Sequence, residues 1–249
     1  MTPDRRLPPG IPEMLEAAGT PPSALDLGCG SGRLTVALAT AGAAATGIDI
    51  SDRRLAQARE RARAEGVDVR FLHADMTEPL PFADGEFAAV LSRLSIMIVP
   101  DPVRVLDQAR RVLVPGGVVV TAVWAGVEEN PWFDEARAAA AAALGPDRAA
   151  FARAFGRLGD SEELAAVHRD AGLRDITATV LRDELPAPSA AAHWQDLTER
   201  IGRFRRLAAA LAEDEAAAVV AELERRLEPY RSGAEILLPR AMLLVTARR

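Results

Sequence analysis

The chain has 249 residues, of which 49% are hydrophobic, and a formal net charge of −6 at pH 7. This length suits one well-buried domain with room for an insertion. The acidic balance is the reverse of the basic surface that binds phosphate backbones, so we expect no nucleic-acid partner. One cysteine, Cys29, excludes an internal disulfide. No apolar run approaches the roughly 18 residues of a membrane span, and no apolar leader follows the N-terminus. We therefore expect a cytoplasmic protein without a membrane partner.

Apolar segments of strand length alternate with helical segments in the first half of the chain. A helix is predicted over about residues 12–18. Strands are predicted at residues 23–28, 43–50, 67–75, 88–95 and 118–124. Helices are predicted between them at residues 31–42, 52–66 and 102–113. Apolar strands separated by helices are typical of a parallel sheet covered on both faces. The predicted fold class is α/β, doubly wound.

The second half of the chain is less regular. The predicted elements are an alanine-rich helical tract at 135–158, a helix at 161–172, and strands at 173–185 and 235–249. Between the last two strands, residues 194–230 predict two further helices. We expect a single domain over residues 1–249 in which residues 187–233 form a helical lid over the carboxyl ends of the strands. Packing of these helices elsewhere, as added core, is the alternative.

A glycine-rich turn stands directly after the first predicted strand, in the stretch LDLGCGSGRL (Leu25–Leu34). Such a turn lets a ligand approach the main-chain N–H groups at a helix N-terminus. The dinucleotide motif G-x-G-x-x-G would need a third glycine where Arg33 stands, whereas the third glycine here is Gly32. An acid, Asp26, precedes the first glycine, Gly28, by two residues. This acid-x-G-x-G-x-G order resembles motif I of the class I S-adenosylmethionine-dependent methyltransferases.

Later positions extend this resemblance over roughly residues 23–124. Asp49 ends the second strand where the family has an acid that binds ribose hydroxyls, and Ile50 would lie against the adenine. The resemblance implies a mostly parallel, seven-stranded Rossmann-like sheet that binds S-adenosylmethionine (SAM), with S-adenosylhomocysteine as product. Cys29 is interpreted as a small residue that fits the turn. The residues that the resemblance assigns to the cofactor are Asp26, Gly28, Cys29, Gly30, Gly32, Asp49, Ile50, Asp75, Met76, Ser92 and Arg93.

The later segments VWAGVEENPWF, AGLRDI, HWQDL and LLVTAR resemble the branch of the family that includes quinone-biosynthesis and other small-molecule methyltransferases. The segment after the fourth strand departs from that branch. That branch often reads S-R-F-x-L-H-H-V, whereas this chain reads SRLSIMIVPD, with Met97 and Ile98 in place of the histidines. A proton-handling role of those histidines is not transferable. Ser92 and Arg93 are retained, and the resemblance places their backbone at the methionine part of SAM.

Methyl transfer from SAM mainly requires an aligned acceptor and the exclusion of water. A general base helps only when the acceptor keeps a proton near neutral pH. His193, beside the start of the predicted lid, is the best candidate for that base. His73 on the third strand is a weaker candidate, and His168 is expected at the surface. No His or Cys spacing resembles a metal site, so no metal is predicted, although a carboxylate-bound magnesium would leave no such trace.

Aromatic residues make up only 4% of the chain and fall largely after the fifth strand and in the predicted lid. We expect an apolar acceptor pocket, with ordinary packing as the alternative for each residue. Its predicted lining is Trp124, Trp132, Trp194, Phe204 and Tyr230. The predicted function is methyl transfer from SAM to a small, largely apolar organic acceptor, by a monomer or homodimer. Two alternatives stay open: a SAM-binding enzyme of this fold that catalyses a cyclisation or elimination, and a non-catalytic SAM-binding module.

Overall fold

The computed structural model describes residues 7–148 and 157–249. The described residues group into two compact units. The first unit lies within Met1–Trp124, Leu158–Leu181 and Met242–Arg249, and the second within Ala125–Arg157 and Arg182–Ala241. Each is described by itself below. The single domain with a lid, expected from the sequence, stays a prediction.

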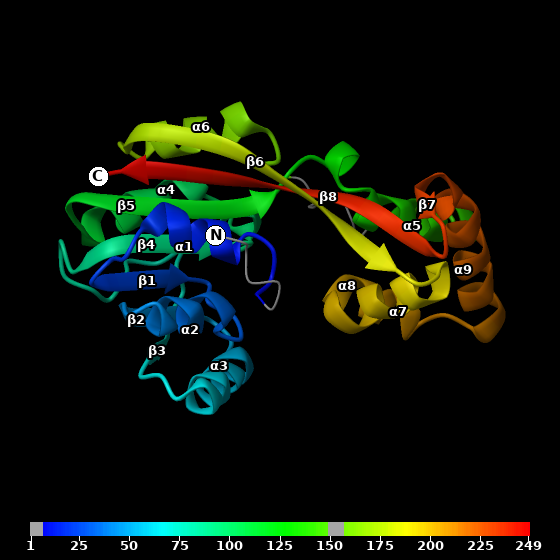
Figure 1. Cartoon of the computed structure of the whole chain (residues 1–249), viewed down its shortest axis with the longest axis horizontal. Helices are drawn as coiled ribbons and strands as arrows, with labels where there is room; N and C mark the ends of the chain where they lie inside the picture. Colours follow the sequence, from blue (N-terminus) through cyan, green and yellow to red (C-terminus); the bar gives the residue numbers. More distant parts are fainter. Residues whose placement is uncertain (1–6, 149–156) are drawn as a thin grey trace. The chain divides into compact units, whose positions relative to one another are not determined.

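The first unit contains the alternating strands and helices (Figure 1). Its elements are α1 (Ile11–Ala18), β1 (Ser23–Leu27), α2 (Arg33–Thr40), β2 (Ala44–Asp49), α3 (Asp52–Glu65), β3 (Arg70–His73), β4 (Phe87–Arg93), the 3-10 helix η1 (Ile96–Ile98), α4 (Pro102–Val112), β5 (Leu113–Trp124) and α6 (Ser161–Asp170). Two strands of 14 residues, β6 (Arg174–Ala187) and β8 (Glu235–Arg248), have residues in both units.

The sheet has the order β3-β2-β1-β4-β5-β8-β6 in the described residues, and a two-residue strand, β7 (Arg231–Ser232), pairs with β8. Strands β1 to β5 are mutually parallel, and Figure 1 shows β1, β4 and β5 side by side. Strand β8 runs antiparallel to β5. The predicted doubly wound, mostly parallel sheet is confirmed.

Local sequence signals explain several helix boundaries. Helix α3 begins after Ser51, whose Oγ accepts a hydrogen bond from the Arg54 N–H, and it ends at Gly66 in the left-handed conformation. Helix α4 begins with Pro102 after Asp101, whose carboxylate accepts from the Arg104 N–H. These caps satisfy N–H groups that the first turn of a helix leaves unpaired.

Alternate strand residues of the first unit form a core against α1 and α2. Val118, Val120 and Ala122 of β5 are buried in one cluster with Ile11 of α1 and Leu38 of α2. Because strand side chains alternate between faces, this cluster covers one face of the sheet. The core therefore fixes the sheet from which the site residues below project.

The second unit is mainly helical. Its elements are the 3-10 helix η2 (Val127–Glu129), α5 (Pro131–Leu144), α7 (Ala190–Arg200), α8 (Gly202–Ala208), α9 (Glu213–Leu227), the 3-10 helix η4 (Glu228–Tyr230) and β7, with parts of β6 and β8.

The prediction of two helices over 194–230 is wrong, because three α-helices include residues of this segment. Ile201, in an extended conformation, separates α7 from α8. The helical tract predicted at 135–158 ends at Leu144, before Gly145 with φ 90°, and its residues 149–156 lie outside the described residues. The role of these helices as a lid stays a prediction. In the described chain, no helix combines the length and apolar character needed to cross a membrane.

Candidate functional site

The carboxyl ends of four parallel strands meet at one edge of the sheet in the first unit. In the register of the strands, Leu27 pairs with Ile48, and Asp49 pairs with His73. The glycine turn follows β1, Asp49 ends β2, Asp75 follows β3, and η1 follows β4. Ligands of doubly wound proteins bind at this edge. The residues predicted for the cofactor therefore gather on a common edge.

The backbone of the glycine turn lies in close contact with neighbouring segments of the protein. Gly28 has φ 69°, and a Cβ there would lie 2.5 Å from Ser95 Cβ and 3.0 Å from Met76 Cε. Gly32 caps α2 with φ 77°, and a Cβ there would lie 2.8 Å from Ala58 Cβ. Both positions require glycine for conformation and for space. The turn thereby brings β1, α3 and the segment after β4 close together.

Asp49 is held rigidly at the end of β2. Its Oδ2 accepts a hydrogen bond of 2.9 Å from the Gly30 N–H, and its Oδ1 accepts one of 2.9 Å from the Ser51 N–H. The side chain is only 8% exposed. A carboxylate oxygen can accept more than one hydrogen bond, so Asp49 keeps acceptor capacity toward a ligand. This carboxylate fits paired hydroxyl groups such as those of a ribose.

An apolar and a polar group flank Asp49. Ile50 is 63% exposed, so its side chain offers an aliphatic face to a flat ring. Asp75 Oδ1 accepts from the N–H and the hydroxyl of Thr77, at 2.8 and 2.7 Å, and these bonds hold the pKa of this carboxyl below its usual value. Asp75 Oδ2 makes no hydrogen bond to any described residue. The ionised Asp75 thus offers an acceptor to an amino group.

A chain of hydroxyls fixes the segment after β4. Ser95 Oγ donates to the Leu27 carbonyl at 2.7 Å, so it accepts from Ser92 Oγ at 2.6 Å. Arg93 donates through Nε and Nη2 to the Pro9 carbonyl, at 3.0 and 2.8 Å. The first of these interactions secures the backbone where the glycine turn begins, and the second secures the backbone before α1. The predicted contacts of Ser92 and Arg93 with SAM involve their backbone and stay predictions.

Asp26 and Cys29 lie beneath the turn. Asp26 is 2% exposed and accepts from Thr35 Oγ1 at 2.7 Å, and burial raises the pKa of its carboxyl to about 6. Burial also raises the pKa of the Cys29 thiol. Cys29 is therefore protonated near neutral pH, as suits a small packing residue rather than a nucleophile.

The arrangement as a whole fits an adenosine. It combines a fixed carboxylate for ribose hydroxyls, an exposed aliphatic side chain for a purine face and a free carboxylate oxygen for an amino group. Residues 25–121 also match the family model described as "Methyltransferase domain". These residues form a class I, SAM-dependent methyltransferase domain.

The methyltransferase domain has relatives among curated proteins. An uncharacterized protein of Mycobacterium bovis is 39% identical over 100 residues, which are 40% of this chain and 36% of that protein. The ubiquinone biosynthesis O-methyltransferase of Methylococcus capsulatus is 41% identical over 96 residues, which are 39% of this chain and 40% of that protein. The chain thus spans about two fifths of the length of these relatives.

A solved structure, the YcgJ protein of Bacillus subtilis, matches with a TM-score of 0.62 and 16% identity. The match covers 96% of this chain and 97% of that one. At this identity the likeness shows the fold alone, and it confirms the Rossmann-like methyltransferase fold.

The three histidines have different surroundings. His73 is exposed, with Nδ1 3.3 Å from Asp52 Oδ1. His168 was expected at the surface, and this is wrong. Its Nδ1 donates to the Leu164 carbonyl at 2.8 Å, its Nε2 lies 3.1 Å from the Thr121 hydroxyl, and burial lowers its pKa to about 4. His193, in the second unit, is buried, and its role as a base stays a prediction.

Three of the five predicted pocket residues form one aromatic cluster in the second unit with Phe133. Ring centroids lie 5.4 Å apart for Phe133 and Phe204, 5.6 Å for Trp194 and Phe204, and 5.7 Å for Trp132 and Phe133, all edge to face. These rings are 8% exposed or less, so they form core in that unit.

The remaining two aromatic residues have separate partners. The Tyr230 hydroxyl donates to Glu135 Oε1 at 3.3 Å. Trp124 ends β5 and packs against the core cluster of the first unit. Contact of any of the five with an acceptor stays a prediction. Among the described residues, no three His, Cys, Asp or Glu side chains are grouped as a metal ion would require.

Sequence reasoning missed Ser95 and Thr35, which position the glycine turn and Asp26. Serine and threonine are common at strand and helix ends, and no local pattern distinguishes the hydroxyl that bonds to another element. Ser95 lies 68 residues from its carbonyl partner, and Thr35 is buried beside a carboxylate only because α2 packs on β1.

Proposed function

We propose that the chain transfers a methyl group from SAM to a small, largely apolar organic acceptor. The observation that carries the proposal is Asp49, held by two backbone N–H groups at the end of β2 beside the exposed Ile50, within a methyltransferase domain.

The residues at the sheet edge have separate roles in this proposal. Asp49 binds the ribose hydroxyls through its remaining lone pairs, Ile50 packs on the adenine, and Asp75 Oδ2 accepts from the adenine amino group. Met76, whose Cε reaches toward Gly28, forms an apolar wall of the same site. Bound SAM supplies an activated methyl group, so the chain needs no nucleophile of its own. The protein contributes orientation and exclusion of water.

The 3-10 helix η1 supports an apolar acceptor. Ile96 and Met97 are buried, whereas Ile98 is 65% exposed at the sheet edge where the cofactor residues gather. This segment presents an aliphatic surface and no proton acceptor side chain. The similarity to a protein named as a ubiquinone biosynthesis O-methyltransferase supports a small organic acceptor. The acidic net charge supports the absence of a nucleic-acid partner. A cytoplasmic location and a monomeric or homodimeric state complete the proposal.

Calorimetric titration with SAM, S-adenosylhomocysteine and NAD tests the cofactor. We expect micromolar binding of both sulfur compounds and none of NAD. Asp49→Ala should weaken SAM binding at least tenfold, because it removes charge-assisted hydrogen bonds to the ribose. Asp68→Ala removes an exposed carboxylate elsewhere in the same unit and should leave the affinity unchanged. Absence of SAM binding by the folded protein would contradict the proposal.

The reaction itself is tested by S-adenosylhomocysteine release with a panel of small phenols, quinols, amines and thiols. We expect release with at least one apolar member of the panel. Tight SAM binding without release from any acceptor would favour the cyclisation or elimination alternative, or a non-catalytic SAM-binding module.

A further inference from the structure

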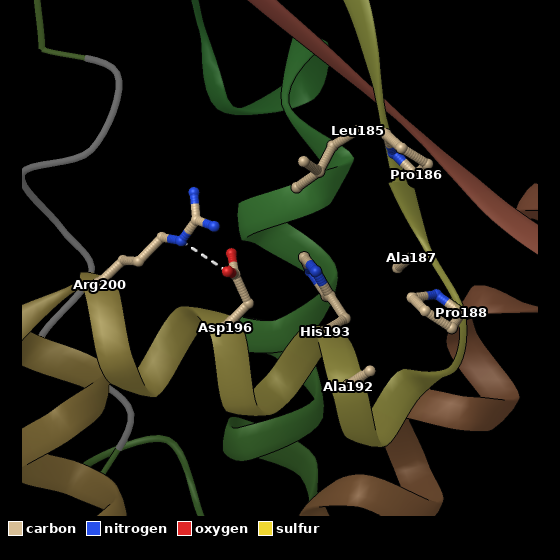
Figure 2. A pocket seen from close by; sticks show the side chains of 8 residues that line it. All are labelled: Leu185, Pro186, Ala187, Pro188, Ala192, His193, Asp196 and Arg200. Carbon is tan, nitrogen blue, oxygen red and sulfur yellow. Dashed lines mark ion pairs between the residues drawn. The ribbon is translucent and has the colours of Figure 1, made fainter. Parts of the chain in front are cut away.

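The second unit contains a pocket of about 220 Å³ between the end of β6 and α7 (Figure 2). One wall is the segment Leu185–Pro188, and the other is a face of α7 that presents Ala192, His193, Asp196 and Arg200. His193, Asp196 and Arg200 follow helical spacing, so they share this face. All of these residues belong to the second unit. Of these residues, only His193 is also a candidate base for methyl transfer.

His193 supplies the pocket with a hydrogen-bond acceptor. The residue is 2% exposed, and its Nε2 lies 2.6 Å from the Trp132 carbonyl oxygen. A carbonyl can only accept, so Nε2 carries the proton, and Nδ1 of the neutral ring has a free lone pair. Burial lowers the pKa of His193, which keeps the ring neutral near pH 7.

No described residue donates to Nδ1 of His193. Among the described side chains, Glu13 Oε2 is the only N or O atom that is both fully buried and without a hydrogen-bond partner. Nδ1 of His193 has no partner either, so it is not fully buried. Nδ1 therefore has accessible surface. In Figure 2 the ring stands among the other lining residues, between Asp196 and the segment Ala187–Pro188. A ligand in the pocket can thus reach an acceptor that the protein leaves unused.

The rest of the lining favours an uncharged, ring-shaped ligand. Pro186 and Pro188 have no N–H group to donate, and their aliphatic rings give this wall apolar surface. Asp196 Oδ1 lies 2.5 Å from Arg200 Nε, and this ion pair leaves the opposite wall without net charge. The volume is below the roughly 300–1,000 Å³ of pockets that hold drug-sized ligands. It suits a single ring.

We propose that this pocket binds a single-ring phenol, whose hydroxyl donates a hydrogen bond to His193 Nδ1 while its ring packs on Pro186 and Pro188. A phenolic O–H is an acidic donor that remains protonated near neutral pH, which matches a neutral imidazole acceptor. Binding requires neither SAM nor methyl transfer, so the inference goes beyond the proposed function and is tested without the cofactor.

The test is calorimetric titration of the full chain, free of SAM, with phenol and with anisole, its methyl ether. Phenol should bind at least tenfold more tightly, because anisole cannot donate to Nδ1. His193→Phe keeps a flat ring at this position but has no hydrogen-bond acceptor. We expect this variant to lose the preference for phenol.

Two variants separate the pocket from the rest of the surface. Ala192→Phe fills the pocket from α7 and should abolish phenol binding. Ala191→Phe adds the same ring at the neighbouring exposed position, which does not line the pocket, and should leave phenol binding unchanged. Equal affinity for phenol and anisole, or unchanged phenol binding in Ala192→Phe, would overturn the inference. Neither result affects the SAM titration, so the two proposals fail independently.

Discussion

Asp26→Asn tests the electrostatics beneath the glycine turn. The carboxyl is 2% exposed, and burial raises its pKa from the ordinary 3.8 to about 6, against the opposing effects of the Thr35 hydrogen bond and the Arg93 charge. The native state therefore binds this proton more tightly than the unfolded chain. An asparagine has nearly the same shape and can still accept from Thr35 Oγ1, but it carries no charge.

The sign and the size of the effect follow from linkage. Because the folded pKa is raised, the contribution of Asp26 to stability is present below about pH 3.8 and is lost as the pH rises toward 6. Each pKa unit is worth about 1.36 kcal/mol, so the complete loss is about 3 kcal/mol. Most of it falls between pH 4 and pH 8. Relative to the parent chain, Asp26→Asn should gain roughly 2 to 3 kcal/mol of unfolding free energy over this interval.

The assay is urea unfolding of parent and variant at half-unit pH steps from 4 to 8, without SAM. The measured quantity is the difference in unfolding free energy between parent and variant at each pH, because titration of every other group contributes similarly to both proteins. Asp68→Asn, at an exposed position, controls for the loss of one carboxylate and should stay within about 0.5 kcal/mol of the parent. A difference between Asp26→Asn and the parent that is constant from pH 4 to 8 would refute the reasoning.

Three further predictions concern other parts of the chain. Gly28→Ala should weaken SAM binding and lower the free energy of unfolding by more than about 1 kcal/mol, because the added Cβ would lie 2.5 Å from Ser95 Cβ. Calorimetry measures the SAM affinity and urea unfolding measures the stability. Values equal to those of the parent chain would contradict the geometry. Phe204→Ala should cost about 3 to 5 kcal/mol, because this ring is 0% exposed and contacts two others, and a loss below about 1 kcal/mol would show that the cluster is not core. The pKa of His168 is lowered to about 4, so stability should fall by roughly 3 kcal/mol as the pH drops from 6.5 to 4, and His168→Gln should flatten that dependence in the same urea series.

The sequence predicted the elements of the first unit because their signals are local. Strand β2 is an apolar run ending in Asp49, and α3 is bounded by a serine and a glycine that cap it. The position of Asp49 relative to the glycine turn was predicted for the same reason, since the length of α2 fixes the distance between β1 and β2 along the chain. Such signals depend on neighbours in sequence, and the structure confirms the elements that they predicted.

Other features depend on residues far away in the sequence, and no local pattern contained them. His168 has polar neighbours in α6, yet it is buried against Thr121 of β5. The acceptor of the His193 N–H is the carbonyl of Trp132, 61 residues earlier. The break between α7 and α8 depends on one extended residue, Ile201, in an otherwise helical pattern. Tertiary packing decided the burial of His168 and the partner of His193, and it overrides residue type.

The strand order also bears on how the protein acquires its fold during synthesis. Strand β8 comes last along the sequence, yet it lies between β5 and β6 in the sheet. On the ribosome, β5 is complete long before β8 exists. Until β8 is made, β5 is the edge strand of the parallel sheet, and its N–H and C=O groups on that side are unpaired. A nascent chain at this stage presents an apolar strand that other chains can pair with. Closing that edge is left to β8, so the edge of β5 stays unpaired while the residues between β5 and β8 are synthesised.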